Sequence, residues 1–181
     1  MSVQIWFSSD HHFGHRNLWE TFKLEDGSPA RPFTSTEEMD ELMIQKHNAV
    51  VRPEDHWYSL GDICMARGNQ TKYIDAIMCR LNGHKRICLG NHDQLNSKWY
   101  FRWFEKVKAV NVLDNILFTH IPVHTQSLGR FKACVHGHTH HNDIMLSPHH
   151  PDPRYLNVCV EKTSYSPISL EEVQSRIAEA Q

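Results

Sequence analysis

The feature of this chain that most constrains its fold is a pattern that recurs along its length. A short apolar run ends abruptly in a polar loop rich in aspartate, asparagine, histidine and glycine. Runs of this length that contain Val, Ile, Phe and Tyr predict strands of a buried sheet. Because α/β folds place their ligands at the carboxyl ends of strands, the polar loops predict a site there. The runs occupy residues 3–7, 56–60, 85–89, 115–119 and 133–135.

Three helices are predicted between or after these strands, over Thr34–Val51, Gln70–Leu81 and Ser169–Ala180. The first and third begin with a capping box, a serine followed three residues later by a glutamate. Alternating strands and helices predict α/β layers, and 181 residues suit one domain spanning residues 1–181.

The second half of the chain is predicted to consist mainly of consecutive strands. We expect strands over Val107–Val112, Asp143–Leu146 and Tyr155–Val160, with Asp114-Asn115 as a hairpin turn. The segments 23–33 and 147–153 are rich in Pro, Gly and Asp and predict exposed loops. Together these patterns favour a sheet-on-sheet core flanked by helices, with the polar loops gathered at one end.

Composition narrows the functional class. A formal charge of −2 argues mildly against a binder of large polyanions. Five cysteines without a CxxC pair are typical of buried small side chains in a reducing compartment. No apolar stretch reaches the roughly 20 residues of a membrane helix, so we expect a cytoplasmic protein with no membrane partner. Most of the 15 histidines cluster in the polar loops, which indicates metal chemistry.

The polar loops together supply one set of metal-ligating side chains. Carboxylate oxygen, amide oxygen and imidazole suit Mn, Fe, Zn, Ni or Co, and the absence of thiolates argues against a structural zinc site. Residues two apart in a strand-end loop are expected to project to the same side. Glycines at positions 61, 90 and 137 would let the backbone turn beneath a crowded centre. The set comprises Asp10, His12, Asp62, Asn91, His92, His120, His138 and His140.

In this order the motifs resemble the calcineurin-like metallophosphoesterase superfamily. The matching segments are Asp10-His11-His12, Gly61-Asp62, Gly90-Asn91-His92-Asp93, His120 and Gly137-His138-Thr139-His140. Several motifs in the correct order are far more specific than any one of them. The resemblance covers nearly the whole chain and implies an α/β fold: a four-layer α/β/β/α sandwich of two mixed β-sheets flanked by helices.

The resemblance also implies that the site binds two divalent transition-metal ions, with manganese favoured, and assigns a role to each site residue. One ion would be held by Asp10, His12 and His140, the other by Asn91, His120 and His138, and Asp62 would bridge them. A metal-bridging hydroxide would attack phosphorus. His92 would protonate the leaving group, with Asp93 fixing its ring and favouring its protonated form.

Two further segments each allow two interpretations. His15, Arg16 and Asn17 at a predicted helix start could bind a substrate phosphate, or Arg16 could pair with Glu20. The aromatic and basic stretch 98–104 could stack a nucleobase, although helical spacing of Trp99 and Trp103 favours core packing.

The sequence therefore predicts a dinuclear metal-dependent hydrolase of phosphomonoesters or phosphodiesters. A small phosphate ester or nucleotide is the favoured substrate, ahead of nucleic acid. Two alternatives stay open: a non-catalytic metal-binding scaffold of the same fold, and a histidine-rich protein that sequesters zinc. The physiological substrate and the oligomeric state are not encoded in these motifs.

Overall fold

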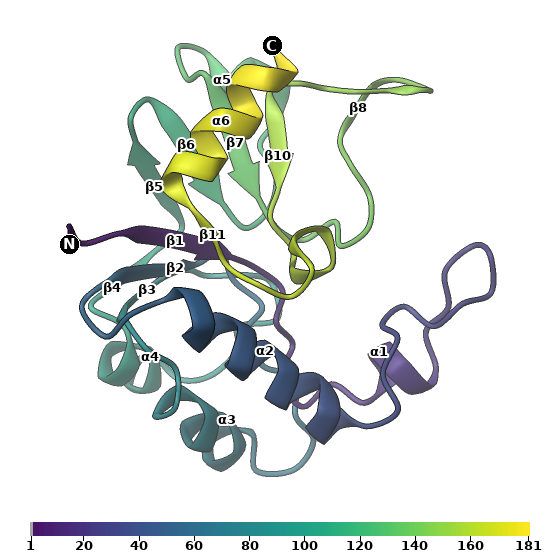
Figure 1. Cartoon of the computed structure of the whole chain (residues 1–181), viewed down its shortest axis with the longest axis vertical. Helices are drawn as coiled ribbons and strands as arrows, with labels where there is room; N and C mark the ends of the chain where they lie inside the picture. Colours follow the sequence, from purple (N-terminus) through teal and green to yellow (C-terminus); the bar gives the residue numbers. More distant parts are fainter. Residues whose placement is uncertain (1) are drawn as a thin grey trace.

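The strands of the protein form two mixed sheets flanked by helices, as the computed structural model of residues 2–181 shows (Figure 1). In the first sheet β1 pairs in parallel with β2, β2 with β3 and β3 with β4, while β11 is antiparallel to β1. The strands, in their order across this sheet, are β11 (Ile168–Ser169), β1 (Ile5–Ser8), β2 (His56–Ser59), β3 (His84–Cys88) and β4 (Lys106–Lys108).

The second sheet is also mixed. Its strands, in order, are β10 (Tyr155–Asn157), β7 (Ala133–His136), β6 (Ile116–Thr119) and β5 (Val110–Leu113). All neighbours are parallel except β5 and β6, which form an antiparallel hairpin. Two mixed sheets with flanking helices confirm the expected α/β sandwich.

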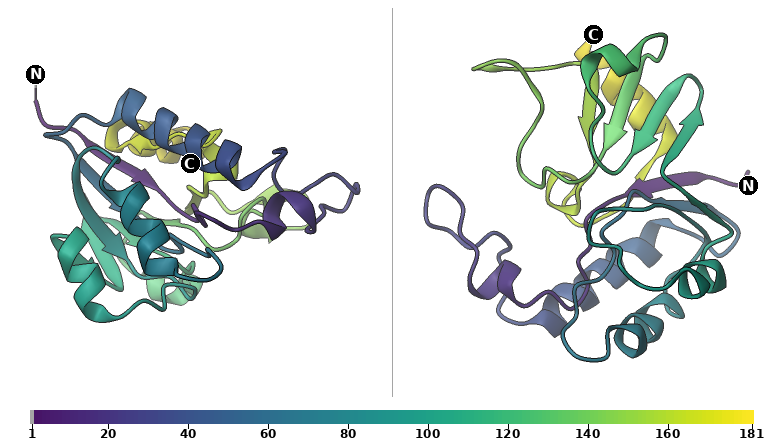
Figure 2. Two further views of the ribbon diagram at one scale, coloured as in Figure 1. Left: turned by 90° about the horizontal axis from the view of Figure 1, so that it is seen from below. Right: turned by 180° about the vertical axis from the view of Figure 1, so that it is seen from behind.

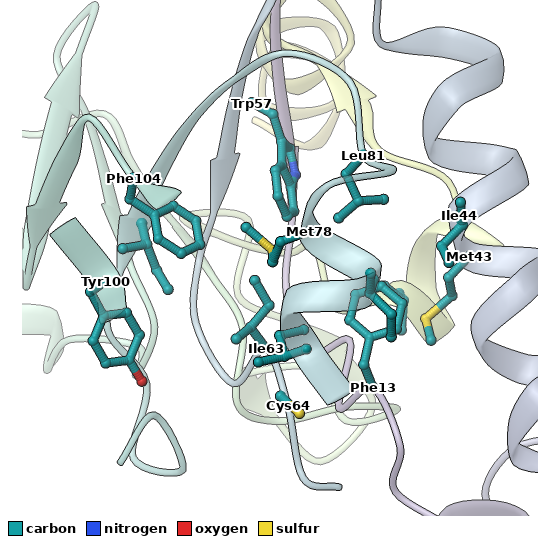
Figure 3. Close-up of a cluster of buried hydrophobic side chains, with 14 of the residues drawn as sticks. Phe13, Met43, Ile44, Trp57, Ile63, Cys64, Met78, Leu81, Tyr100 and Phe104 are labelled. Carbon is teal, nitrogen blue, oxygen red and sulfur yellow. The ribbon is translucent and has the colours of Figure 1, made fainter. Parts of the chain in front are cut away.

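Helices α2 (Thr36–Val50), α3 (Gln70–Met78) and α4 (Ser97–Trp103) lie on the first sheet, on the side away from the second (Figure 1). Their apolar faces share a core with Trp57 of β2 and Ile87 of β3 (Figure 3). The Ser35 side chain accepts a hydrogen bond from the Glu38 backbone at 3.1 Å, so α2 begins with the predicted cap.

A second core lies between the sheets. Phe7 of β1 stacks on Phe118 of β6 with 4.3 Å between ring centroids. Helix α6 (Leu170–Ala180) lies beside β10 and β11 and adds Val173 and Ile177 to this core. The alternation of strand side chains therefore divides the apolar residues between two cores and fixes the order of the layers.

Two predicted strands differ from the observed ones. The segment Val107–Val112 is two strands, β4 and β5, which belong to different sheets. Apolar and polar residues alternate in Val107-Lys108-Ala109 and again in Val110-Asn111-Val112, but the alternation shifts by one residue between Ala109 and Val110, where the chain leaves one sheet for the other. Tyr155–Val160 ends as a strand at Asn157, and a short 3-10 helix, η1 (Val160–Thr163), follows.

The hairpin turn predicted in the second half of the chain is confirmed. Asp114 and Asn115 form the predicted hairpin turn between β5 and β6, with left-handed φ of 48° and 64°. The predicted strand 143–146 only overlaps the observed β8 (Met145–Ser147). Segment 147–153 is exposed as predicted, but it contains a second strand, β9 (His150–Pro151), which pairs with β8 in a small hairpin outside both main sheets.

Residues 16–30 form a segment that projects from the body of the molecule, here called the arm (Figure 2). It contains the short helix α1 (Asn17–Glu20) and is largely exposed, as predicted for segment 23–33. Arg31, just past the arm, is the exception to that prediction because it is wholly buried. None of the helices in residues 2–181 has the length and apolarity that crossing a membrane requires.

Candidate metal centre

The loops that follow β1, β2, β3, β6 and β7 converge at one end of the two sheets, as the polar pattern predicts. Parallel pairing continues beyond the strands, because the Asp10 N–H donates to the Gly61 carbonyl and the His12 N–H to the Asp62 carbonyl, each at 3.0 Å. This pairing brings Asp10, His12 and Asp62 together as three almost fully buried polar side chains.

A first group of ligand atoms comprises Asp10, His12 and His140, whose atoms all lie within 4.8 Å of one another. His12 Nε2 is 3.6 Å and His140 Nε2 is 3.8 Å from Asp10 Oδ1. One carboxylate oxygen and two imidazole nitrogens at this spacing fit a single divalent transition-metal ion.

A second group comprises Asp10, Asp62 and His120, again within 4.8 Å. His120 Nε2 lies 3.4 Å from Asp62 Oδ2 and 2.9 Å from Asn91 Oδ1. The His138 ring is 5.1 Å from the His120 ring, centroid to centroid. The same Asp62 oxygen is 3.7 Å from His12 Nε2, so it lies between the two groups, where a bridging ligand would be.

Five of these residues have a left-handed backbone, which side-chain-bearing residues rarely adopt: Asp10, His12, Asp62, His138 and His140, with φ between 48° and 70°. Such residues cost on the order of 1 kcal/mol each and cluster at functional sites. The side chains of Asp10 and His12, and those of His138 and His140, therefore converge because their backbones are left-handed. The alternation of side chains along a strand, which the sequence suggested, is not the cause.

The glycines that precede the ligand loops are required by close approach of the loops. A Cβ on Gly90 would overlap the Asp62 carboxylate, and a Cβ on Gly137 would overlap the side chains of Ser9 and Asp10. Gly61 has a φ of +100° in addition, and its Cβ would lie 2.6 Å from the Gly90 nitrogen.

Several polar atoms in this cluster have no hydrogen-bond partner within residues 2–181. They are Asp10 Oδ1 and both ring nitrogens of His12, all buried. Leaving such atoms unpaired costs free energy, and a divalent cation between them would remove that cost. The residues present therefore fit a metal centre.

The ionisation of the cluster also suits a cation. Burial opposes the charge on Asp10, but its contact with His12 and the charges of the neighbouring histidines hold its pKa below the ordinary value. Burial lowers the pKa of His12 and outweighs the opposing pull of Asp10, which favours the neutral imidazole that a metal requires.

Two residues that the sequence did not single out support this cluster. Glu161, whose side chain is 2% exposed, accepts from Arg31 Nε at 2.8 Å and lies 3.0 Å from His140 Nδ1. Arg31 also donates to the backbone carbonyls of Asp10 and His11. Arg31 and Glu161 are 130 positions apart, so no local pattern signals their contact.

His92 and Asp93 lie beside the second group. The His92 N–H donates to Asp62 Oδ1 at 2.8 Å, and the side chain is exposed, with its ring 5.6 Å from the His12 ring. The Asp93 carboxylate accepts from the backbone of Asp62, Gly90 and Ile63 at 2.8–3.1 Å. Within residues 2–181 the hydrogen bonds of Asp93 thus hold this loop, whereas the sequence suggested a bond to the His92 ring.

The three candidate phosphate-binding residues are separated by the structure. Arg16 pairs with Glu20, the alternative interpretation, and Asn17 accepts from Arg67 at 3.1 Å. His15 alone faces the centre, with its ring 5.6 Å from the His12 ring. The aromatic stretch 98–104 forms α4, where Trp99 and Tyr100 are buried in the core.

Comparison with known proteins gives relatives over most of the chain. No family model matches. The chain is 31% identical over 169 residues to the uncharacterized protein MJ1445 of Methanocaldococcus jannaschii, covering 93% of this chain and 88% of that protein. It is 30% identical over 177 residues to the gene 66 protein of Mycobacterium phage L5, covering 80% of each.

The fold is shared with a solved structure. The crystal structure of the protein of unknown function AQ665 from Aquifex aeolicus superimposes with a TM-score of 0.70 at 20% identity. The match covers 96% of this chain and 99% of that chain. The arrangement of two sheets and their flanking helices is therefore shared with a protein of low sequence identity.

Proposed function

The chain belongs to the family of MJ1445 of Methanocaldococcus jannaschii and the gene 66 protein of Mycobacterium phage L5, and we propose that it is a phosphoester hydrolase that works with two divalent metal ions. The observation that carries the proposal is the convergence of two buried carboxylates and two buried histidines, with ligand atoms left unpaired, at the end of both sheets. The ordered motifs of the calcineurin-like metallophosphoesterase superfamily agree with it.

In this proposal Asp10, His12 and His140 would hold one ion. Asn91, His120 and His138, which lie close together, would hold the other, with Asp62 as a shared ligand. Bound ions, with manganese favoured by the resemblance to that superfamily, would neutralise the phosphoryl charge and acidify the attacking water. The left-handed backbone of the ligand residues holds their side chains in place before an ion arrives.

His92 is proposed as the general acid. Hydrolysis forms a bond from a water oxygen to phosphorus and breaks the bond from phosphorus to the leaving oxygen, which takes a proton from a ring nitrogen of His92. The proton of the attacking water passes to solvent. The exposed side chain of His92 beside a buried ligand cluster suits this role. Asp93 would act through the loop, by holding the backbone that carries Asp62 and His92.

The test uses manganese-loaded protein with p-nitrophenyl phosphate as monoester and bis(p-nitrophenyl) phosphate as diester. We expect hydrolysis of at least one ester. With phenyl phosphate, whose leaving oxygen is more basic and needs a proton, we expect kcat to fall about 10²–10⁴-fold in His92→Ala, since a positioned general acid contributes that much. Metal analysis should still find two ions per chain in the variant.

His149→Ala, in the exposed β8–β9 hairpin, is the matched control and should retain full activity. Fully metallated protein that cleaves neither ester, nor any ester in a wider panel, would contradict the proposal and favour the non-catalytic scaffold. More than two tightly bound ions, together with unchanged binding in Asp62→Asn, would favour metal sequestration.

A further inference from the structure

A cavity of about 850 Å³ opens directly beside the candidate metal centre. Its floor includes His12, His92 and His140, so it is continuous with the ligand cluster and with the proposed general acid. A cavity of this size accommodates an organic group much larger than phosphate itself. The protein therefore has room for a substrate group in addition to the phosphoryl group.

The arm forms one wall of this cavity through Leu18, Phe22 and Leu24, and Met65 lines it from the loop after β2. Phe22 is 46% exposed, and its ring stands edge-on to the His15 ring, with 5.8 Å between centroids. An aromatic side chain that is half exposed beside a cavity offers a surface on which a flat apolar group gains free energy by stacking or burial.

The charged residues that the arm contributes to the cavity do not select a second phosphate or another strongly anionic group. Glu25 and Asp26 line it alongside Lys23, so the charged side chains of the arm nearly cancel and lean negative. All three are exposed to solvent. On the side formed by the arm, the cavity would therefore hold a bound group mainly through apolar contacts and not through charge.

We propose that this cavity binds the leaving group of the phosphoester and that this group is a flat, largely apolar ring. The position of His92 in the floor identifies the group, because the general acid must face the leaving oxygen. The inference rests on the proposed phosphoesterase function and adds the substrate class: aromatic or heteroaromatic esters are preferred over small alkyl esters, with Phe22 and Leu24 as specificity-determining residues.

Binding of phosphonates tests the cavity separately from catalysis, since a phosphorus–carbon bond is not hydrolysed. Benzylphosphonate places a ring where an aryl ester would have one, and ethylphosphonate is its small counterpart. Calorimetry on manganese-loaded protein should show benzylphosphonate binding about tenfold more tightly, as partial burial of one ring predicts. Phe22→Ala should reduce this ratio to about threefold or less without weakening ethylphosphonate, and Leu24→Ala should reduce it in the same direction.

Phe101→Ala is the matched control, because Phe101 is 69% exposed on α4 and does not line the cavity. It should keep the wild-type ratio, and thermal unfolding checks that all variants are folded. Equal binding of the two phosphonates, or an unchanged ratio in Phe22→Ala, would overturn the inference while the hydrolase proposal stands. If neither phosphonate binds and no ester of the wider panel is cleaved, the function itself fails, and the inference with it.

Discussion

The guanidinium of Arg31 and the carboxylate of Glu161 form a buried pair beneath the ligand loops, with 2.7 Å between Arg31 Nη2 and Glu161 Oε1. Burial opposes the charge on Glu161, but Arg31 and His140 lower its pKa to about 2. An ionised carboxylate only accepts hydrogen bonds, so His140 must carry its proton on Nδ1. His140 Nε2, which faces Asp10, is then free to bind a cation.

This contact predicts that Glu161→Gln weakens binding of the ion held by Asp10, His12 and His140. Loss of such a supporting carboxylate typically lowers metal affinity 10–100-fold, because the histidine becomes less basic and less well oriented. Titration of metal-free protein with manganese should therefore show one weakened and one unchanged site.

Glu171→Gln, at the exposed start of α6, is the matched control and should bind both ions as the wild type does. Wild-type affinities at both sites in Glu161→Gln would show that Glu161 only packs beneath the loops.

At the scale of the elements, the backbone is more constrained just beyond the ends of the strands than within them. The left-handed ligand residues and the glycines beside them occupy the short loops after β1, β2, β3 and β7. The loop after β2 packs directly on the loop after β3, through Gly61 and Gly90. Stability and ligand geometry are therefore coupled in these loops.

We predict that Gly61→Ala destabilises the protein by about 2–5 kcal/mol, through both the left-handed backbone and the overlap of the new Cβ with Gly90. Gly68→Ala is the matched control. Gly68 also has a left-handed φ, +76°, but a Cβ there meets nothing within 4 Å. Urea unfolding should give a loss of about 1–2 kcal/mol for the control, and an equal loss in the two variants would exclude the overlap.

Local sequence patterns correctly predicted those features whose determining residues lie close together in the sequence. The serine cap of α2, the Asp114-Asn115 turn and the polar strand ends depend on residues a few positions apart. The split of segment 107–112 between two sheets was not predicted, because its first part pairs back with β3 and its second part forward with β6, and a single apolar run does not indicate these partners. Arg31 was expected in an exposed loop, since nothing near it in sequence indicates the buried partner Glu161.

At the scale of the whole molecule, the proposed ligands come from both sheets. Asp10 and Asp62 follow strands of the first sheet, and His120 and His138 follow strands of the second. Ions bound between them would connect the two halves of the core at one end. The free energy of metal binding would then add to the stability of the whole fold.

Removal of the ions should therefore lower the thermal unfolding midpoint. An ion at a free concentration one thousand times its Kd adds about 4 kcal/mol, which corresponds to a shift of about 8–16 °C in a chain of this size. Scanning calorimetry with manganese and after chelation measures the shift. Asp62→Asn should unfold at nearly the same temperature under both conditions, and an equally insensitive wild type would show that the loops bind no stabilising ion.

The arm leaves the body next to His15 and returns to it at the buried Arg31, while the residues between these two anchors are mostly exposed. Its loss or replacement would remove little of either core. The length and composition of the arm can therefore diverge between homologues, or be exchanged by grafting, while the candidate metal centre is left unchanged. Substrate selectivity would then depend on the arm and hydrolysis on the metal centre, so that each could be engineered without changing the other.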